Sequence, residues 1–241
     1  MSDMSNHKRA NRASSEGMKK NETSKKEEKD VTKAVRTVIE RLTNEFNIVF
    51  EHEKRLYLKE IVDLLKNKFP DVRFADPTSK RPFITPDAGI TYMKAVDGGR
   101  FPILIGEVKN QGTNDLRAKE GKPKQSKGNA VERLGKNVIG LRIYMDMIDK
   151  GIFPFVCFGD GCDFAPGSSI LDRVLTIAMF GELMCDHTDT EADFFNRGSF
   201  YFREKRWTKE EMEEIMYMVA KHSIDHYFEK YGKAHFVNVS A

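Results

Sequence analysis

Two acidic residues and one lysine occur at a spacing that suits phosphodiester hydrolysis. Asp87 follows a proline, and Glu107 and Lys109 stand two residues apart at the end of an apolar segment. Because alternate residues of a strand face the same side of a sheet, Glu107 and Lys109 would share one face. Two neighbouring carboxylates repel each other unless a cation lies between them, and their oxygens suit Mg²⁺. A lysine beside metal-bound water can orient that water or stabilise the charge of the reacting phosphate, so the three residues are candidates for a Mg²⁺-dependent hydrolytic site.

A predicted hairpin would position these side chains. Residues 88–108 contain two strand-like segments separated by the turn signal Val96-Asp97-Gly98-Gly99, which predicts an antiparallel pair. This pairing can place Asp87, at the entrance of the first strand, beside Glu107, near the end of the second. Burial of Glu107 at the end of an apolar strand would be costly without a partner or a metal ion, which favours a functional site over a solvated sheet edge.

The segments that follow predict an α/β fold. A long amphipathic helix begins near Asn129, with Gly151 as its expected C-cap. The continuous apolar run at 153–158 predicts a buried strand. Because a strand, a crossover helix and a second strand form a parallel pair, the expected fold is a central mixed sheet flanked by helices. That sheet would combine the antiparallel hairpin with parallel strands.

The other segments predict one domain with an appended arm. Residues 1–30 are polar and basic, which predicts a flexible arm, and residues 31–241 predict a single domain with a recognition loop and helix at 112–150. Residues 169–180 fit a helix or a strand. The further expected elements are helices at 31–49, 54–68 and 208–232, the last with a capping box of Thr208 and Glu211, and a strand at 199–202.

The distribution of charge indicates a polyanionic partner. The formal net charge is only +3, but residues 117–136 carry seven Lys or Arg against two Glu. Local basic patches attract polyanions even when the whole molecule is nearly neutral. Three scattered cysteines argue against a disulfide framework and for a reducing compartment, and the cytoplasm is expected. No apolar run long enough for a membrane span and no secretory signal occur.

Two motifs are similar to those of a known enzyme family. The residues Pro86-Asp87 and Glu107-X-Lys109 resemble the signature of the PD-(D/E)XK nucleases. Residues 128–133, Gly-Asn-Ala-Val-Glu-Arg, resemble the recognition motif of EcoRI-like type II restriction endonucleases, including the MunI branch. The resemblance covers roughly residues 60–220 and implies the restriction-endonuclease-like fold.

The resemblance assigns a role to each residue of the hydrolytic site. It implies that Asp87 and Glu107 hold Mg²⁺, with the backbone carbonyl of Val108 as a further ligand. Lys109 would stand beside the attacking water. The implied reaction is site-specific hydrolysis of double-stranded DNA that leaves 5′ overhangs with 5′-phosphates.

The resemblance also implies how DNA is read. In the family the recognition motif reads an inner AATT, and one subunit reads each half of the palindrome, so a homodimer is expected. Departures from the family pattern at 125–127 and at Ile170 affect positions that read the outer base pair, so the expected site is AATT alone or with other flanking bases. A cognate DNA methyltransferase is the expected functional partner. The implied DNA-contacting residues are Gly128, Asn129, Ala130, Glu132 and Arg133, together with Gln111, Gln125, Lys127 and Arg173.

Two other functions fit the same scaffold. A PD-(D/E)XK nuclease of repair or recombination would cut according to DNA structure, but it would lack the recognition motif. A DNA-binding protein without turnover would not need the acidic pair and lysine, which argues against it.

Overall fold

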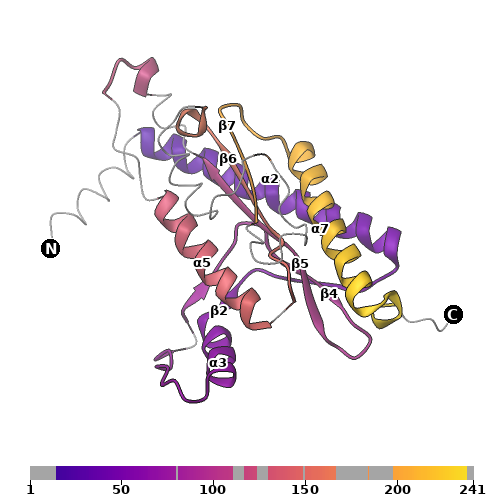
Figure 1. Ribbon diagram of the computed structural model, residues 1–241. Helices are drawn as coiled ribbons and strands as arrows, with labels where there is room; N and C mark the ends of the chain where they lie inside the picture. Colours follow the sequence, from indigo (N-terminus) through magenta and orange to yellow (C-terminus); the bar gives the residue numbers. More distant parts are fainter. Residues whose placement is uncertain are drawn as a thin grey trace.

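The computed structural model is built around a five-stranded mixed sheet with helices on both faces (Figure 1). The predicted α/β fold class, with an antiparallel hairpin and parallel strands, is confirmed. The expected segment at 169–180 lies outside the described part of the chain. The structure describes residues 15–79, 81–110, 117–123, 130–148, 150–166, 184 and 198–237.

The sheet has the strand order β1-β4-β5-β6-β7. Its first three strands pair antiparallel and its last three pair parallel, so β5 has one neighbour of each kind. The predicted parallel pairing of the strands before and after the crossover helix is confirmed by β5 and β6, and the strand expected at 199–202 is present as β7. The bounds are β1 (Phe50–Glu53), β4 (Gly89–Lys94), β5 (Arg100–Asn110), β6 (Phe155–Asp160) and β7 (Ser199–Arg203).

A second, two-stranded sheet pairs β2 (Leu56–Tyr57) with β3 (Phe83–Ile84) and was not predicted. The helix expected at 54–68 begins later, as α3 (Leu58–Lys68). Strands of two residues are too short to show an alternating pattern, and β1 is mostly polar, so periodicity does not reveal these three strands.

Two pairs of helices cover the two faces of the main sheet (Figure 1). Helices α2 (Ser15–Phe46) and α7 (Lys209–Tyr231) pack on the face that contains Val156 and Phe158. Helices α3 and α5 (Ala130–Ile148) pack on the face that contains Ile105 and Cys157. Because Glu107 and Lys109 follow Ile105 at alternate positions of β5, they lie on the α5 face of the sheet.

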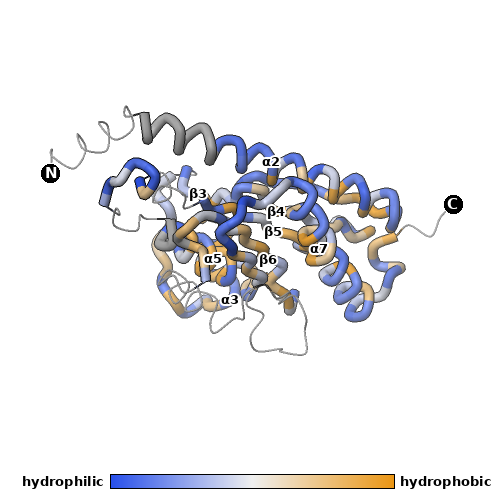
Figure 2. The backbone as a smooth tube through the Cα atoms, turned by 90° about the horizontal axis from the view of Figure 1, so that it is seen from above, coloured by the Kyte–Doolittle hydropathy of each residue, from blue (hydrophilic) through white to orange (hydrophobic). Residues whose placement is uncertain are grey.

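Helix α2 shows that the prediction of a flexible arm is wrong for residues 15–30. It begins at Ser15, well before the predicted start at Val31, so residues 15–30 are helical. This stretch contains no proline and is rich in Glu and Lys, which favour helices. Apolar periodicity begins only at Val31, because the preceding turns pack through a polar contact at Glu27. Figure 2 shows hydrophilic residues predominating along α2 where it crosses the sheet.

The predicted C-terminal helix is confirmed in detail. The hydroxyl of Thr208 accepts a hydrogen bond from the amide of Glu211, whose carboxylate accepts one from the amide of Thr208 in return. Gly232 ends the helix with a positive φ of 80°, a conformation that glycine adopts without strain. Within the described residues, no helix is long and apolar enough to cross a membrane.

Candidate active site

The β4–β5 hairpin brings Asp87, just before the start of β4, beside Glu107, near the end of β5. Gly89 pairs with Gly106, and the amide of Ala88 donates to the carbonyl of Gly106. A Cβ atom at Gly106 would lie 2.6 Å from the Cβ of Ala88, so only glycine allows this approach. The backbone that carries Asp87 is thereby held against the strand that carries Glu107.

Backbone amides fix both carboxylates. The amide of Asp87 donates to Glu107 Oε2 at 3.1 Å, and the amide of Val108 donates to Asp87 Oδ2 at 3.0 Å. Each acidic residue is therefore oriented by the chain segment that carries the other. The sequence predicts this neighbourhood, and the structure contains it.

The ammonium of Lys109 lies among the oxygens of this site. It donates to Asp87 Oδ2 and to the carbonyl of Val108, each at 3.0 Å, and it forms an ion pair with Glu107. Burial raises the pKa of Glu107; Lys109 opposes this shift and Asp87 adds to it. Burial alone would lower the pKa of Lys109, but the two carboxylates outweigh burial and raise it above its ordinary value. Lys109 is therefore a cation at neutral pH in the free protein.

The oxygens around Lys109 fit a divalent cation. Asp87 Oδ2, Glu107 Oε1 and the Val108 carbonyl oxygen converge on one positive group. Mg²⁺ is bound in proteins through one or two carboxylates and keeps several waters, so two carboxylates and a carbonyl are a suitable donor set. No cluster of three or more His, Cys, Asp or Glu that could hold a metal occurs among the described residues. The fit to Mg²⁺ therefore rests on two carboxylates and one backbone oxygen.

Asn137 is a member of this site that the sequence did not indicate. Its side-chain amide donates to Glu107 Oε1 at 3.1 Å, from the helix that begins with the recognition motif. Asn137 lies between the buried residues Leu134 and Val138. A polar side chain on the inner face of an amphipathic helix is the sequence signal that could have identified Asn137. Asn137 thus links α5 directly to a carboxylate of the site.

The structure describes part of the expected DNA-reading surface. Helix α5 begins at Ala130, close to the predicted start, and Arg133 is exposed in its first turns. Ala130 and Glu132 belong to this helix, but their side chains lie outside the described part. The expected contacts that lie outside the described residues altogether are Gln111, Gln125, Lys127, Gly128, Asn129 and Arg173.

Comparison with known proteins assigns the chain to a family. The family model described as restriction endonuclease EcoRI matches residues 15–179. The type II restriction enzyme RsrI of Cereibacter sphaeroides is 32% identical, over 78% of this chain and 79% of its own length. The type II restriction enzyme EcoRI of Escherichia coli is 29% identical, over 51% of this chain and 47% of its own length. The match to the family model covers the hairpin, the lysine and the start of α5, and the chain therefore belongs to the EcoRI family of type II restriction endonucleases.

Proposed function

We propose that this enzyme hydrolyses double-stranded DNA in a Mg²⁺-dependent reaction at a palindrome that contains AATT, leaving 5′ overhangs with 5′-phosphates. The observation that carries the metal dependence is the convergence of Asp87, Glu107 and the Val108 carbonyl on one cationic group. The AATT core is inferred from the sequence of the recognition motif at 128–133. Bases that flank AATT are not fixed by this motif.

The residues of the site have different roles in the proposed reaction. Asp87, Glu107 and the Val108 carbonyl would hold Mg²⁺, which supplies positive charge for the phosphate and lowers the pKa of bound water. Lys109 donates hydrogen bonds as a cation, so it can orient the attacking water and stabilise the charge that develops on the phosphate oxygens. The amide of Asp87 and the side chain of Asn137 hold Glu107 in place for these steps.

The N-terminal part of α5 is the proposed base-reading element. Asn129 can pair with the N6 and N7 positions of adenine, and Arg133 can reach a purine N7 in the major groove. Gln111, Gln125, Lys127 and Arg173 are proposed to contact DNA nearby. Because a palindrome presents two identical half-sites, a homodimer with one active site per strand is proposed. A cognate methyltransferase that protects host DNA completes the proposed system in the cytoplasm.

Digestion of a sequenced genome tests this proposal. We expect discrete fragments in Mg²⁺ whose mapped ends carry 5′-AATT overhangs. Asp87→Asn and Glu107→Gln should abolish cleavage and retain site-specific binding, whereas Asp97→Asn, in the exposed hairpin turn, should cut at the wild-type rate. Ends that follow DNA structure instead of sequence would indicate a repair nuclease. Specific binding without any cleavage by the wild type would indicate a non-cleaving DNA-binding protein.

A further inference from the structure

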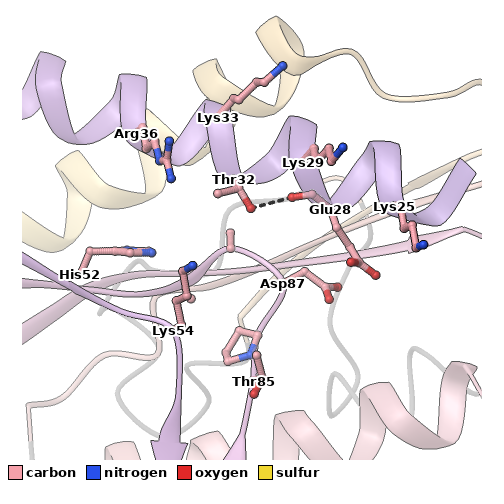
Figure 3. A pocket seen from close by; sticks show the side chains of 13 residues that line it. Lys25, Glu28, Lys29, Thr32, Lys33, Arg36, His52, Lys54, Thr85 and Asp87 are labelled. Atoms are coloured by element: carbon pink, nitrogen blue, oxygen red, sulfur yellow. Dashed lines mark hydrogen bonds between the residues drawn. The ribbon is translucent and has the colours of Figure 1, made fainter. Parts of the chain in front are cut away.

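A pocket of about 420 Å³ lies between α2 and the turn that carries Asp87 (Figure 3). Residues of α2 form one wall, and Thr85–Gly89, His52 and Lys54 form the other. Asp87 belongs to both this pocket and the active site, so whatever binds in the pocket lies next to the reacting phosphate.

The side chains of the pocket are predominantly cationic. Asp87 and Glu28 are its acidic side chains, and the charge of Asp87 is offset in part by Lys109 at 3.0 Å. Within the described part of the chain, the pocket's cationic groups form no ion pair with an acidic residue, whereas Arg41, farther along the same helix, pairs with Glu214. A net positive and unneutralised pocket suits an anionic ligand. The five cationic residues are Lys25, Lys29, Lys33, Arg36 and Lys54.

Three of these cations are aligned along one face of α2. Lys25, Lys29 and Lys33 are spaced four residues apart, which places them one above another on a helix. Like charges at this spacing destabilise a helix, and a bound anion would relieve this repulsion. Four residues of helix rise about 6 Å, close to the axial rise of two nucleotides of one DNA strand at about 3.4 Å each.

The opposite wall strengthens the positive character of the pocket. Lys54 extends from the turn after β1 toward α2, and Figure 3 shows His52 and Arg36 near the end of the pocket away from Asp87. Burial lowers the pKa of His52, and the nearby Lys54 and Arg36 lower it further. The lysines and Arg36 therefore supply the positive charge of the pocket.

We propose that this pocket binds backbone phosphates of double-stranded DNA immediately adjacent to the scissile phosphate at Asp87. The proposal rests on the proposed function in one respect, because it takes Asp87 as the position of the cut. Contacts of this kind position DNA and carry no base information, and they make binding dependent on salt. Helix α2 thus holds the strand at the catalytic edge of the sheet, and α5 reads the bases.

Salt dependence of DNA binding tests the pocket directly. The test variant is Lys29→Gln/Lys33→Gln, and the matched control is Lys230→Gln/Lys233→Gln, which removes two exposed lysines at the far end of α7 and just beyond it. Binding to a duplex that contains the cleavage site is measured without Mg²⁺ at several salt concentrations. Each lost phosphate contact lowers the slope of log K against log salt by about 0.9, so the test variant should lose about 1.8 and the control nothing.

The same change in slope predicts a measurable fold difference. Between 50 and 200 mM salt, wild-type affinity should fall about twelvefold more than that of the test variant, which follows from a slope difference of about 1.8. Equal slopes for the wild type, the test variant and the control would overturn the proposal. Thermal unfolding checks the fold, and removal of the repelling lysines should leave the midpoint of the test variant equal or higher.

Trimming the DNA locates the contact. Duplexes are shortened stepwise outside the cleavage site, and wild-type affinity should fall at the step that removes the phosphates bound by the pocket. The test variant should show no fall at that step, and a parallel fall in both proteins would overturn the assignment to α2. If the wild type cut no DNA in Mg²⁺, the proposed function would be wrong. If the wild type cut specifically and the lysine variant bound DNA with unchanged affinity and salt dependence, only the proposal of phosphate binding in the pocket would be wrong.

Discussion

Glu27 should make the stability of this protein depend on pH. Its side chain lies on α2, is 4% exposed, pairs with Arg206 at 3.0 Å and accepts a hydrogen bond from Asn110. Burial raises the pKa of Glu27 to about 7, and the nearby acidic residues Asp160 and Asp30 raise it further. Arg206 and the hydrogen bond from Asn110 act in the opposite direction and lower it. A carboxyl group whose pKa is higher in the folded protein than in the unfolded chain favours folding when it is protonated.

The sign and size of the effect follow from these two pKa values. The contribution is fully present below the unfolded value of 4.5 and is lost as the pH rises through about 7. One pKa unit corresponds to about 1.4 kcal/mol, so Glu27 should reduce the free energy of unfolding by roughly 2–3 kcal/mol between pH 5 and pH 8. Glu27→Gln keeps the shape and a hydrogen-bond acceptor for Asn110 but cannot ionise, so this part of the pH dependence should disappear.

Denaturant unfolding at pH 5 and pH 8, in buffer with a chelator, measures the difference. The matched control is Glu28→Gln, which changes the exposed neighbour on the same helix and should retain the wild-type pH dependence. The reasoning is refuted if Glu27→Gln and the wild type lose the same stability between the two pH values. A smaller loss in the variant alone would confirm that the buried carboxyl of Glu27, which contacts Asn110 at the end of β5, titrates with a raised pKa in the folded protein.

Three further substitutions test the proposed active site and the proposed base-reading helix. Asn137→Leu should slow cleavage at saturating Mg²⁺ about 10- to 100-fold, because it removes a hydrogen bond that orients Glu107. The affinity for DNA should stay unchanged. An unchanged cleavage rate would exclude a positioning role for Asn137. Lys109→Met should lower the free energy of unfolding by about 3–5 kcal/mol, because Glu107 would stay buried without its cation; denaturant titration against the exposed control Lys136→Met decides this. Arg133→Ala should cost about 1–3 kcal/mol of discrimination in competition binding, and equal losses on specific and random DNA would contradict base reading.

The site was largely predictable because its geometry is local. Asp87 and Glu107 belong to one hairpin, and the alternation of a strand places Lys109 on the same face as Glu107. Short segments of the sequence are enough to predict the turn, the apolar strands and the strand–helix–strand order. These features fix the neighbourhood of the three side chains without knowledge of any distant contact.

The missed features depend on polar contacts between distant segments. Asn137 meets Glu107 across 30 residues, and Asn110 meets Glu27 across 83. Apolar periodicity reports only faces that bury hydrocarbon, so it could not extend α2 toward its start or single out one amide on α5. The pocket beside Asp87 is also not predictable from local patterns, because its two walls come from segments that are distant in the sequence. One wall is α2, and the other is the β1 and β4 region.

The proposed catalytic site contains two carboxylates and must still accept a polyanion, and the charges of this protein are arranged to allow it. Asp87 and Glu107 alone would repel DNA phosphate, but the ammonium of Lys109 lies between them and offsets part of their charge. The lysines of α2 then add positive potential on the side where the proposed DNA backbone enters. The formal net charge is only +3, so the positive potential available to phosphate is local and is not spread over the whole surface. Backbone affinity is therefore concentrated beside the reacting group, and discrimination between sequences is left to the base contacts proposed for α5.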